Sequence, residues 1–363
     1  MKVKSRKSGG ISKRKALFSA IGIAIVLLIL LVVWLGPQNI LERLEKADLF
    51  FIGLALVVEI INLFILAFRW HIFINSVSKV DFKTTFMITL AGSATSNITP
   101  SGRVGGEPLR VYLLRKLKGV RYGTGFATII VERIADMLAF LVLAFVAVVY
   151  SVFFIRLPPH VILLMILSLC STASLIIGLW YVTFRKEIKS TTIEAWLSRH
   201  EWITKKIPVL NYYKSQLEES VSNYYKQISN IMQKRTWFYS GFIISFVYWT
   251  LEIMRAYFLF LAFGEVAHLP VIALAYILSA IIGSLPFGIG GIGLTEGTMI
   301  IIYSTSNINT VVAGIVTVFD RLFSYWLVIL LGLPLAGYLG IESLEVGKYA
   351  RLHDSNSKGS KKG

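Results

Sequence analysis

The chain has 363 residues, of which 55% are hydrophobic and 16% are charged, and its mean hydropathy is +0.69. A water-soluble domain cannot bury that much apolar surface, so the composition excludes a soluble globular protein and predicts an all-α polytopic membrane protein. The formal net charge of +17 would suit nucleic acid, but the basic residues cluster between the apolar runs, as is typical of membrane topology. We therefore expect no nucleic-acid partner.

Residue types that bind metals are few and scattered. The single cysteine, Cys170, lies inside an apolar segment and has no partner for an intrachain disulfide. The five histidines have no spacing typical of metal ligands; they are His71, His160, His200, His268 and His353. The sequence thus predicts no metal site and no cofactor.

The first fifteen residues carry seven Lys and Arg and no acidic residue. The apolar run that follows, 16–35, is longer than the core of a signal peptide and has no small-residue cleavage site. This pattern predicts a basic cytoplasmic N-terminus at residues 1–15 and a retained first membrane span.

Five further apolar segments are long enough to cross a bilayer. They lie at about residues 49–74, 123–155, 161–184, 237–263 and 310–339, and two shorter apolar segments lie at 84–97 and 271–285. If the shorter segments dip in and return, the cytoplasmic side holds 29 Lys and Arg and the outer loops hold 3. Six full crossings of the cell membrane with both termini cytoplasmic then satisfy the positive-inside rule. The alternative is a full crossing by each shorter segment.

Two glycine-rich stretches interrupt the apolar pattern: TPSGRVGGEPLR at 99–110 and SLPFGIGGIGLTEG at 284–297. Both run from a proline through a glycine pair to a glutamate. Such irregular backbone is tolerated at membrane depth only where it is buried in protein or lines a watery cavity. Two broken segments in matching halves of a chain point to the binding site of a transporter.

The halves of the chain match in the order of their polar landmarks. Glu59 corresponds to Glu252, Pro100 to Pro286 and Glu132–Arg133 to Asp320–Arg321, at offsets of 193, 186 and 188 residues. We predict a first membrane repeat at 16–156, a second at 160–341 and a basic cytoplasmic tail at 342–363. Each repeat has three full spans and one broken, re-entrant hairpin. Because three is odd, the second repeat is inverted in the membrane.

The segment 185–235 is the sizeable polar region, and we predict that it is a cytoplasmic insert in the second repeat. Its later part spaces apolar residues as one face of an amphipathic helix: Leu217, Val221, Tyr224, Ile228 and Ile231. Such a helix lies either on the cytoplasmic membrane face or against the bundle. About fifty residues are too few for a catalytic domain.

Charged residues within the apolar segments predict ion pairs, because an isolated charge at the centre of a bilayer costs about 2.5–3.5 kcal/mol. Salt bridges between helices and contacts to a substrate both remain open as their role. The candidate substrate-binding residues are Arg103, Gly105, Gly106, Glu107, Arg110, Glu132, Arg133, Gly290, Gly291, Gly293, Glu296, Asp320 and Arg321. Candidates for intramembrane support are Glu59, Arg69, Asp136, Glu252 and Arg255.

A helix that starts after Gly106 or Gly293 presents free N–H groups and a partial positive charge, which suits an anionic headgroup. Arg103 adds a full charge beside the first break. For Glu107 and Glu296 three roles stay open: capping a half-helix, contacting a cationic headgroup, or carrying a proton.

On these motifs the chain resembles the transmembrane-region family of lysylphosphatidylglycerol synthases, which are flippase-like integral membrane proteins. The motifs are Pro100 to Arg110 with its glycine pair and Glu107, then Glu132–Arg133, and then Pro286 to Glu296. The resemblance covers about residues 15–341 and implies a membrane domain that moves lipids between leaflets. In fused members a cytoplasmic aminoacyl-transferase domain makes the lipid. We expect this chain to be the translocating part without that domain, and not an enzyme.

Three function classes follow. A flippase would move a polar or anionic lipid, held by the glycine breaks, Arg103, Arg133 and Arg321. An accessory subunit would present lipid to a separate cytoplasmic synthase and dock through the amphipathic segment. A membrane-embedded lipid transferase would need a nucleophile or a metal-binding acid cluster, and the sequence shows neither. The oligomeric state does not follow from the sequence.

Overall fold

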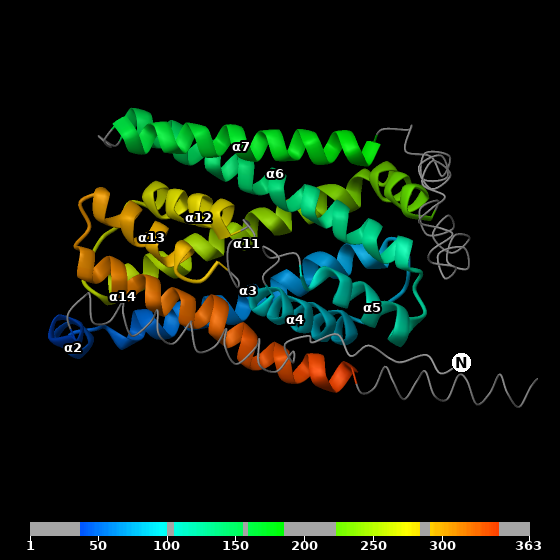
Figure 1. Cartoon of the computed structure of the whole chain (residues 1–363), viewed down its shortest axis with the longest axis horizontal. Coiled ribbons are helices and arrows are strands. Elements are labelled where there is room, and N and C mark those ends of the chain that lie inside the picture. The colour runs from blue at the N-terminus through cyan, green and yellow to red at the C-terminus, as the bar shows by residue number, and fades with distance from the viewer. Residues whose placement is uncertain (1–36, 100–104, 155–158, 185–222, 284–290, 341–363) are drawn as a thin grey trace, which may run out of the picture.

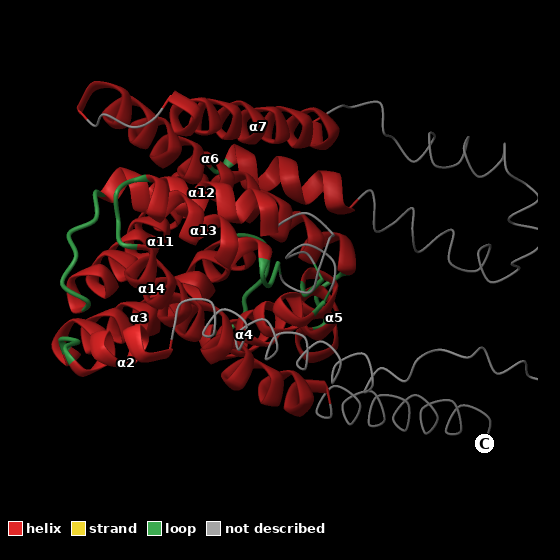
Figure 2. Ribbon diagram, turned by 60° about the vertical axis from the view of Figure 1, so that its left-hand side comes forward, coloured by secondary structure: helices red, strands yellow, loops and turns green. Residues whose placement is uncertain are grey.

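A computed structural model describes residues 37–99, 105–154, 159–184, 223–283 and 291–340. In these ranges every regular element is a helix, as predicted (Figures 1 and 2). The helices that are long and apolar enough to cross a membrane are α3 (Leu49–Asn75), α6 (Tyr122–Phe154), α11 (Arg235–Ala262) and the helix Thr310–Gly340. They coincide to within a few residues with the spans predicted at 49–74, 123–155, 237–263 and 310–339.

The other predicted spans have different outcomes. Helix α7 (Pro159–Phe184) matches the apolar segment predicted at 161–184 and packs along α6 and α12. The short helix α2 (Pro37–Glu45) contacts α14. The predicted first span at 16–35 and the polar segment 185–222 lie outside the described residues.

Helices α3 and α11 form the antiparallel pair at the centre of the bundle. The Asp48 backbone N–H donates to the Ala262 carbonyl oxygen at 2.9 Å, and the Lys234 side chain donates to the Ser76 carbonyl oxygen at 3.2 Å. The start of each helix therefore lies beside the end of the other. Gly241 allows this close approach, because a Cβ there would overlap the Phe73 ring.

Each half of the chain contains a broken hairpin of two short helices. In the first half α4 (Phe82–Ile98) is followed by α5 (Glu107–Lys118), and in the second half α12 (Leu269–Gly283) is followed by α13 (Leu294–Thr305). Helices α5 and α13 begin directly after Gly106 and Gly293, as predicted. The two hairpins lie toward opposite ends of the bundle (Figure 1).

Glycines are required at both breaks for different reasons. Gly106 lies against α4, where an added Cβ would overlap the carbonyl oxygen of Gly92. Gly291 and Gly293 have φ of 73° and 85°, which residues with a Cβ rarely adopt. The first break thus depends on close backbone packing and the second on backbone conformation. Arg103 and Gly290 lie outside the described residues.

After the second hairpin, α14 (Thr310–Arg321) leads into the π-helix η1 (Leu322–Leu327). Both halves thus show the same order of elements: a long helix, two short helices and a long helix. Residue positions match too, since Arg69 lies 20 residues into α3 and Arg255 lies 20 residues into α11. This correspondence has the 186-residue offset of the two prolines and fits the helices better than the predicted pairing of Glu59 with Glu252.

Residues 223–233 form a helix that packs on the bundle. Ile228 and Ile231 are buried there in one apolar cluster with Phe73 of α3 and Ala127 of α6. This part of the amphipathic segment therefore packs against the bundle. Leu217 and Val221 lie outside the described residues.

Candidate functional site

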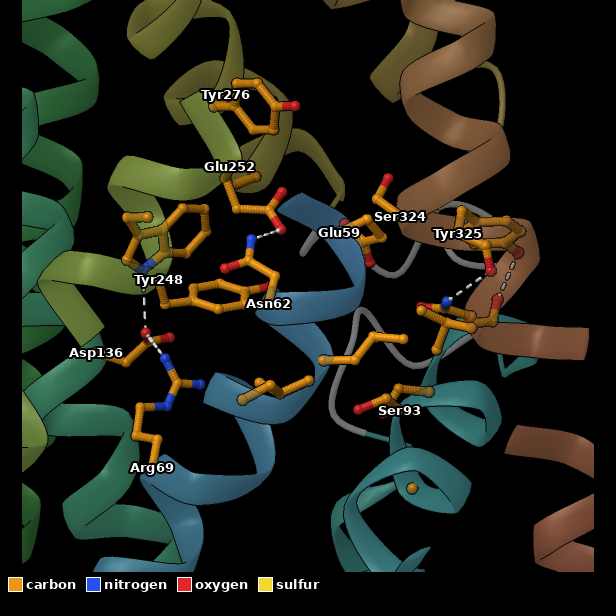
Figure 3. A pocket seen from close by; sticks show the side chains of 18 of the residues that line it. Glu59, Asn62, Arg69, Ser93, Asp136, Tyr248, Glu252, Tyr276, Ser324 and Tyr325 are labelled. Carbon is orange, nitrogen blue, oxygen red and sulfur yellow. Dashed lines mark hydrogen bonds and ion pairs between the residues drawn. The ribbon is translucent and has the colours of Figure 1, made fainter. Parts of the chain in front are cut away.

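A cavity of about 190 Å³ lies between the two halves of the bundle. Its walls come from both broken hairpins and from the long helices α3, α6, α11 and α14, so residues from nearly the whole fold meet in it (Figure 3). Most of the charged residues within the apolar segments line this space. They form two clusters and one separate pair.

The first cluster, here called the balanced cluster, joins α3, α5 and α6. Its members are three arginines and three acids: Arg69, Arg110, Arg133, Glu107, Glu132 and Asp136. Glu132 is the hub, because its two carboxylate oxygens lie 3.2 Å from Arg69 Nε and 2.8 Å from Arg110 Nη2. Equal numbers of opposite charges compensate one another, which offsets much of the cost of burying them.

Aromatic side chains complete the balanced cluster. The Arg110 guanidinium lies 4.2 Å from the centre of the Trp70 ring, and Arg69 lies 5.2 Å from that of Tyr248. Trp249 donates from Nε1 to Asp136 at 3.0 Å. These contacts orient Arg69, Arg110 and Asp136, which indicates a structural role for this part of the cluster.

The second cluster, here called the acidic cluster, joins α3, α11 and α14. It consists of Arg255 and three acids that contact it: Glu59, Glu252 and Asp320. Arg255 Nη2 lies 2.8 Å from an oxygen of Glu252 and 2.8 Å from an oxygen of Asp320. All four side chains are buried, and Arg255 is completely inaccessible.

Two neutral polar side chains extend the acidic cluster toward the cavity. Tyr276 of α12 donates its hydroxyl to Asp320 and accepts from Arg255 at 3.1 Å. Asn62 donates its amide nitrogen to Glu252 at 3.0 Å, and Figure 3 shows it reaching from α3 toward α11. The acids are thus held by hydrogen bonds from several helices.

The remaining pair links the second hairpin to α14. Arg321 Nε lies 3.0 Å from Glu296 Oε1, and the other carboxylate oxygen of Glu296 accepts from the Gly293 N–H at 2.6 Å. Glu296 therefore caps α13, which is one of the three roles left open for it. Glu107 pairs instead with Arg110 and Arg133.

Most of the predicted site residues meet at the cavity. Its lining includes the predicted substrate-binding residues Glu107, Arg110, Glu132, Arg133, Asp320 and Arg321 and the predicted supporting residues Glu59, Arg69, Asp136 and Glu252. Arg255 and Glu296 stand behind this lining as ion-pair partners.

The glycines Gly105, Gly106, Gly291 and Gly293 form the turns before α5 and α13. Two backbone N–H groups at these turns already have partners. Gly106 N–H donates to Ser96 Oγ at 2.9 Å, and Gly293 N–H donates to Glu296.

Sequence reasoning missed the neutral polar side chains of the cavity. Those on α4 are Ser93, Ser96 and Asn97, and the others include Tyr248, Tyr276, Ser279, Ser324 and Tyr325. The α4 residues lie three and four apart, so a polar stripe on a short apolar helix was available as a signal. The Tyr325 hydroxyl donates to the Asn97 carbonyl oxygen at 2.7 Å, which ties the end of α4 to η1.

The π-helix η1 lies directly after Asp320 and Arg321. Short π-helical stretches inside α-helices are frequent at functional sites.

Outside the membrane-spanning segments, a hydrogen bond from Lys118 and one from the Thr84 backbone hold the pKa of the Asp81 carboxyl well below its usual value. Within the described ranges no group of His, Cys, Asp and Glu has an arrangement that would hold a metal ion.

Long apolar helices around a charged cavity define a multi-pass integral membrane protein. Comparison with known proteins identifies its family. The family model for the lysylphosphatidylglycerol synthase TM region matches residues 19–332, and the chain belongs to this family.

Relatives with the name UPF0104 membrane protein match most of the chain. A UPF0104 membrane protein of Methanothermobacter thermautotrophicus is 31% identical over 88% of this chain and 94% of its own length. A UPF0104 membrane protein of Pyrococcus horikoshii is 29% identical over 88% of this chain and 95% of its own length. One of Methanocaldococcus jannaschii is 28% identical over 85% of this chain and 91% of its own length. No solved structure matches the chain.

Proposed function

We propose that the chain is a lipid translocase that moves a polar or anionic lipid between leaflets, with the headgroup in the cavity. The observation that carries this proposal is the cavity itself, a charged space lined by helices from both halves of the chain. Intramembrane ionisable groups around a cavity are typical of substrate and ion pathways. The name of the family concerns a lipid synthase and supports a lipid substrate.

The volume suits a headgroup better than a whole lipid. Pockets for drug-sized ligands span about 300–1,000 Å³, whereas this cavity measures about 190 Å³. The acyl chains would therefore remain in the surrounding lipid, beside the apolar outer faces of the long helices.

An inverted repeat would allow alternating access to the cavity. The antiparallel pair α3 and α11 and the placement of the hairpins toward opposite ends (Figure 1) are what two oppositely oriented repeats would produce. In transporters of this plan, one repeat rocks against the other around a site near the midplane. The basic loops support a cell-membrane location with both termini cytoplasmic.

Each repeat has one ion pair suited to act as a latch between its hairpin and its last long helix. We name Arg133–Glu107 and Arg321–Glu296 the latch pairs. The Arg133 side chain is 36% exposed and that of Arg321 is 12% exposed. In the proposed cycle the two latch pairs open in turn. In this structure the pair at Arg133 is the more exposed of the two.

Purified protein in liposomes with a fluorescent anionic phospholipid provides the test. The variant Arg133→Gln removes the charge of the more exposed latch pair, and we expect it to slow translocation about tenfold or more, equivalent to about 1.4 kcal/mol of barrier. The control Lys118→Gln removes an exposed cation outside the cavity and should translocate at the wild-type rate. Wild-type protein no faster than empty liposomes would contradict the proposal, as would an unimpaired Arg133→Gln variant.

The accessory-subunit alternative depends on a free apolar face in residues 209–233. In the described part of that segment, Ile228 and Ile231 are already packed inside the chain. This packing favours translocation over docking to a separate synthase. The proposed function involves no covalent step.

A further inference from the structure

The acidic cluster holds more negative charge than the described residues around it compensate. Three carboxylates share the one guanidinium of Arg255, so two carboxylates are in excess when all are ionised. The balanced cluster matches three acids with three arginines, and the second latch pair matches one with one. The excess is therefore local to one cluster.

The surroundings of the acidic cluster supply no further cation among the described residues. On α3, Arg69 faces Glu132 and Asp136 of the balanced cluster. On α14, Arg321 faces Glu296. The other titratable neighbours are neutral phenols. Tyr276 on α12 contacts Asp320, Tyr303 on α13 interacts electrostatically with Asp320 and Arg255, and Tyr248 on α11 interacts electrostatically with Glu59 and Glu252.

Burial makes this excess unfavourable. Glu59 and Asp320 are each 2% exposed and Glu252 is 6% exposed. A buried charge without a compensating partner is strongly destabilising, and neighbouring carboxylates avoid it by sharing a proton. A proton on one of the three acids would halve the excess.

Asn62 provides an independent indication. Its side chain is almost fully buried at the cavity wall, and its oxygen Oδ1 has no hydrogen-bond partner in the described part of the chain. Its nitrogen donates to Glu252 (Figure 3). If Glu252 takes up a proton, the amide can turn over and accept the acid O–H with that oxygen. Asn62 is thus suited to both protonation states of its neighbour.

The repeated plan of the fold does not require these extra acids. Arg69–Glu132 and Arg255–Asp320 are corresponding pairs that join the first and last long helices of each half. Glu59 and Glu252 add to the second pair, and Glu59 comes from the opposite half of the chain. A group that spans both halves is placed to respond when they move against each other.

We propose that Glu59, Glu252 and Asp320 form a proton-binding site, and that uptake and release of one proton there couples lipid translocation to a pH gradient. The coupling, though not the binding, rests on the proposed function. A carboxylate takes a proton from water on one side of the membrane to become a neutral acid. It returns the proton to water on the other side after the halves have moved.

Proton binding can be measured without transport. Infrared difference spectra of the purified protein between high and low pH should contain a carboxylic-acid C=O band. Glu59→Gln and Glu252→Gln should each weaken or shift that band, and Asp81→Asn, outside the cavity, should leave it unchanged. Thermal unfolding identifies a variant that has lost its fold, in which case the other variant decides. A band identical in wild type and both folded glutamine variants would overturn the proposal.

Coupling is tested in the liposome assay with an imposed pH gradient. We expect the gradient to accelerate wild-type translocation, and we expect the ratio of rates with and without it to fall to unity in Glu59→Gln and Glu252→Gln. Translocation that ignores the gradient, or that follows a sodium gradient instead, would overturn the coupling and leave the lipid translocase intact. If the carboxylic-acid C=O band is present but the protein translocates no lipid, the proton-binding site stands and the translocase proposal is rejected.

Discussion

The first half of the molecule (α3 to α6) and the second half (α11 to α14) contain corresponding ion pairs with different surroundings. In the first half the Glu132 carboxylate is shared by two arginines, Arg69 and Arg110. In the second half one arginine, Arg255, is shared by three carboxylates. One plan of helices thus supports a charge-compensated cluster on one side and a charge-excess cluster on the other. The compensated cluster is suited to structure and the other to binding a cation such as the proton.

The largest expected effect separates the two clusters directly. Arg255→Met leaves three buried carboxylates without their cation, and removal of one partner of a buried pair costs about 3–5 kcal/mol. Arg69→Met should cost less, because Glu132 keeps Arg110 and Asp136 keeps the Trp249 hydrogen bond. Thermal unfolding in detergent measures both. Equal losses would show that the two clusters are energetically alike.

An intermediate effect is expected at the two glycine breaks. In Gly106→Ala the new methyl group would meet the Gly92 backbone, and overpacking costs about 1–3 kcal/mol, occasionally more. In Gly293→Ala the alanine would have to adopt the positive φ of Gly293, which costs about 1–3 kcal/mol. We expect Gly106→Ala to be the less stable variant in thermal unfolding.

Gly53→Ala is the control for both glycine variants, since nothing lies within 4 Å of an added Cβ there. Its stability should equal or slightly exceed that of the wild type, because alanine favours a helix interior. A Gly106→Ala variant as stable as Gly53→Ala would show that α4 and α5 can separate without loss.

The smallest expected effect lies outside the cavity, at the exposed pair Asp81–Lys118. Because the folded-state pKa of Asp81 is depressed, its ion pair stabilises the fold above the ordinary value of 3.8, and that contribution is lost as the pH falls below it. Asp81→Asn should therefore lower stability at neutral pH by about 1 kcal/mol or less, since exposed pairs are screened.

Asparagine can still cap α4, so the difference between this variant and the wild type should vanish in acid. Unfolding curves at neutral and acidic pH measure it. A difference that persists in acid would assign the effect to the cap and not to the charge.

Local properties of the chain made much of the fold predictable. Apolar length alone located the long helices, because a helix must be about twenty residues long to cross the hydrocarbon core. Glycine and proline located the starts of α5 and α13, because a cluster of these residues disfavours a continuous helix. Most predicted site residues meet at one cavity for the same reason: a charge in an apolar helix must face the protein interior.

Partnership among the charges was not predictable in the same way. Neighbouring residues such as Glu132 and Arg133 point about 100° apart on a helix, and each meets whatever the adjoining helices present. The order of polar residues in the two halves suggested that Glu59 and Glu252 occupy equivalent positions. In the structure both contact Arg255 instead. The neutral cavity residues were not predicted because serine and asparagine in membrane helices also serve helix packing and hydrogen bonds between helices.

The sequence by itself determined that this chain is a multi-pass helical membrane protein with two broken segments, because hydropathy and helix breaking are properties of short stretches. Only the tertiary structure decided which acid faces which arginine, and hence that one cluster is compensated and the other carries excess negative charge. Electrostatic energy depends on distances between groups that lie far apart in the chain, and those distances exist only once the helices have packed.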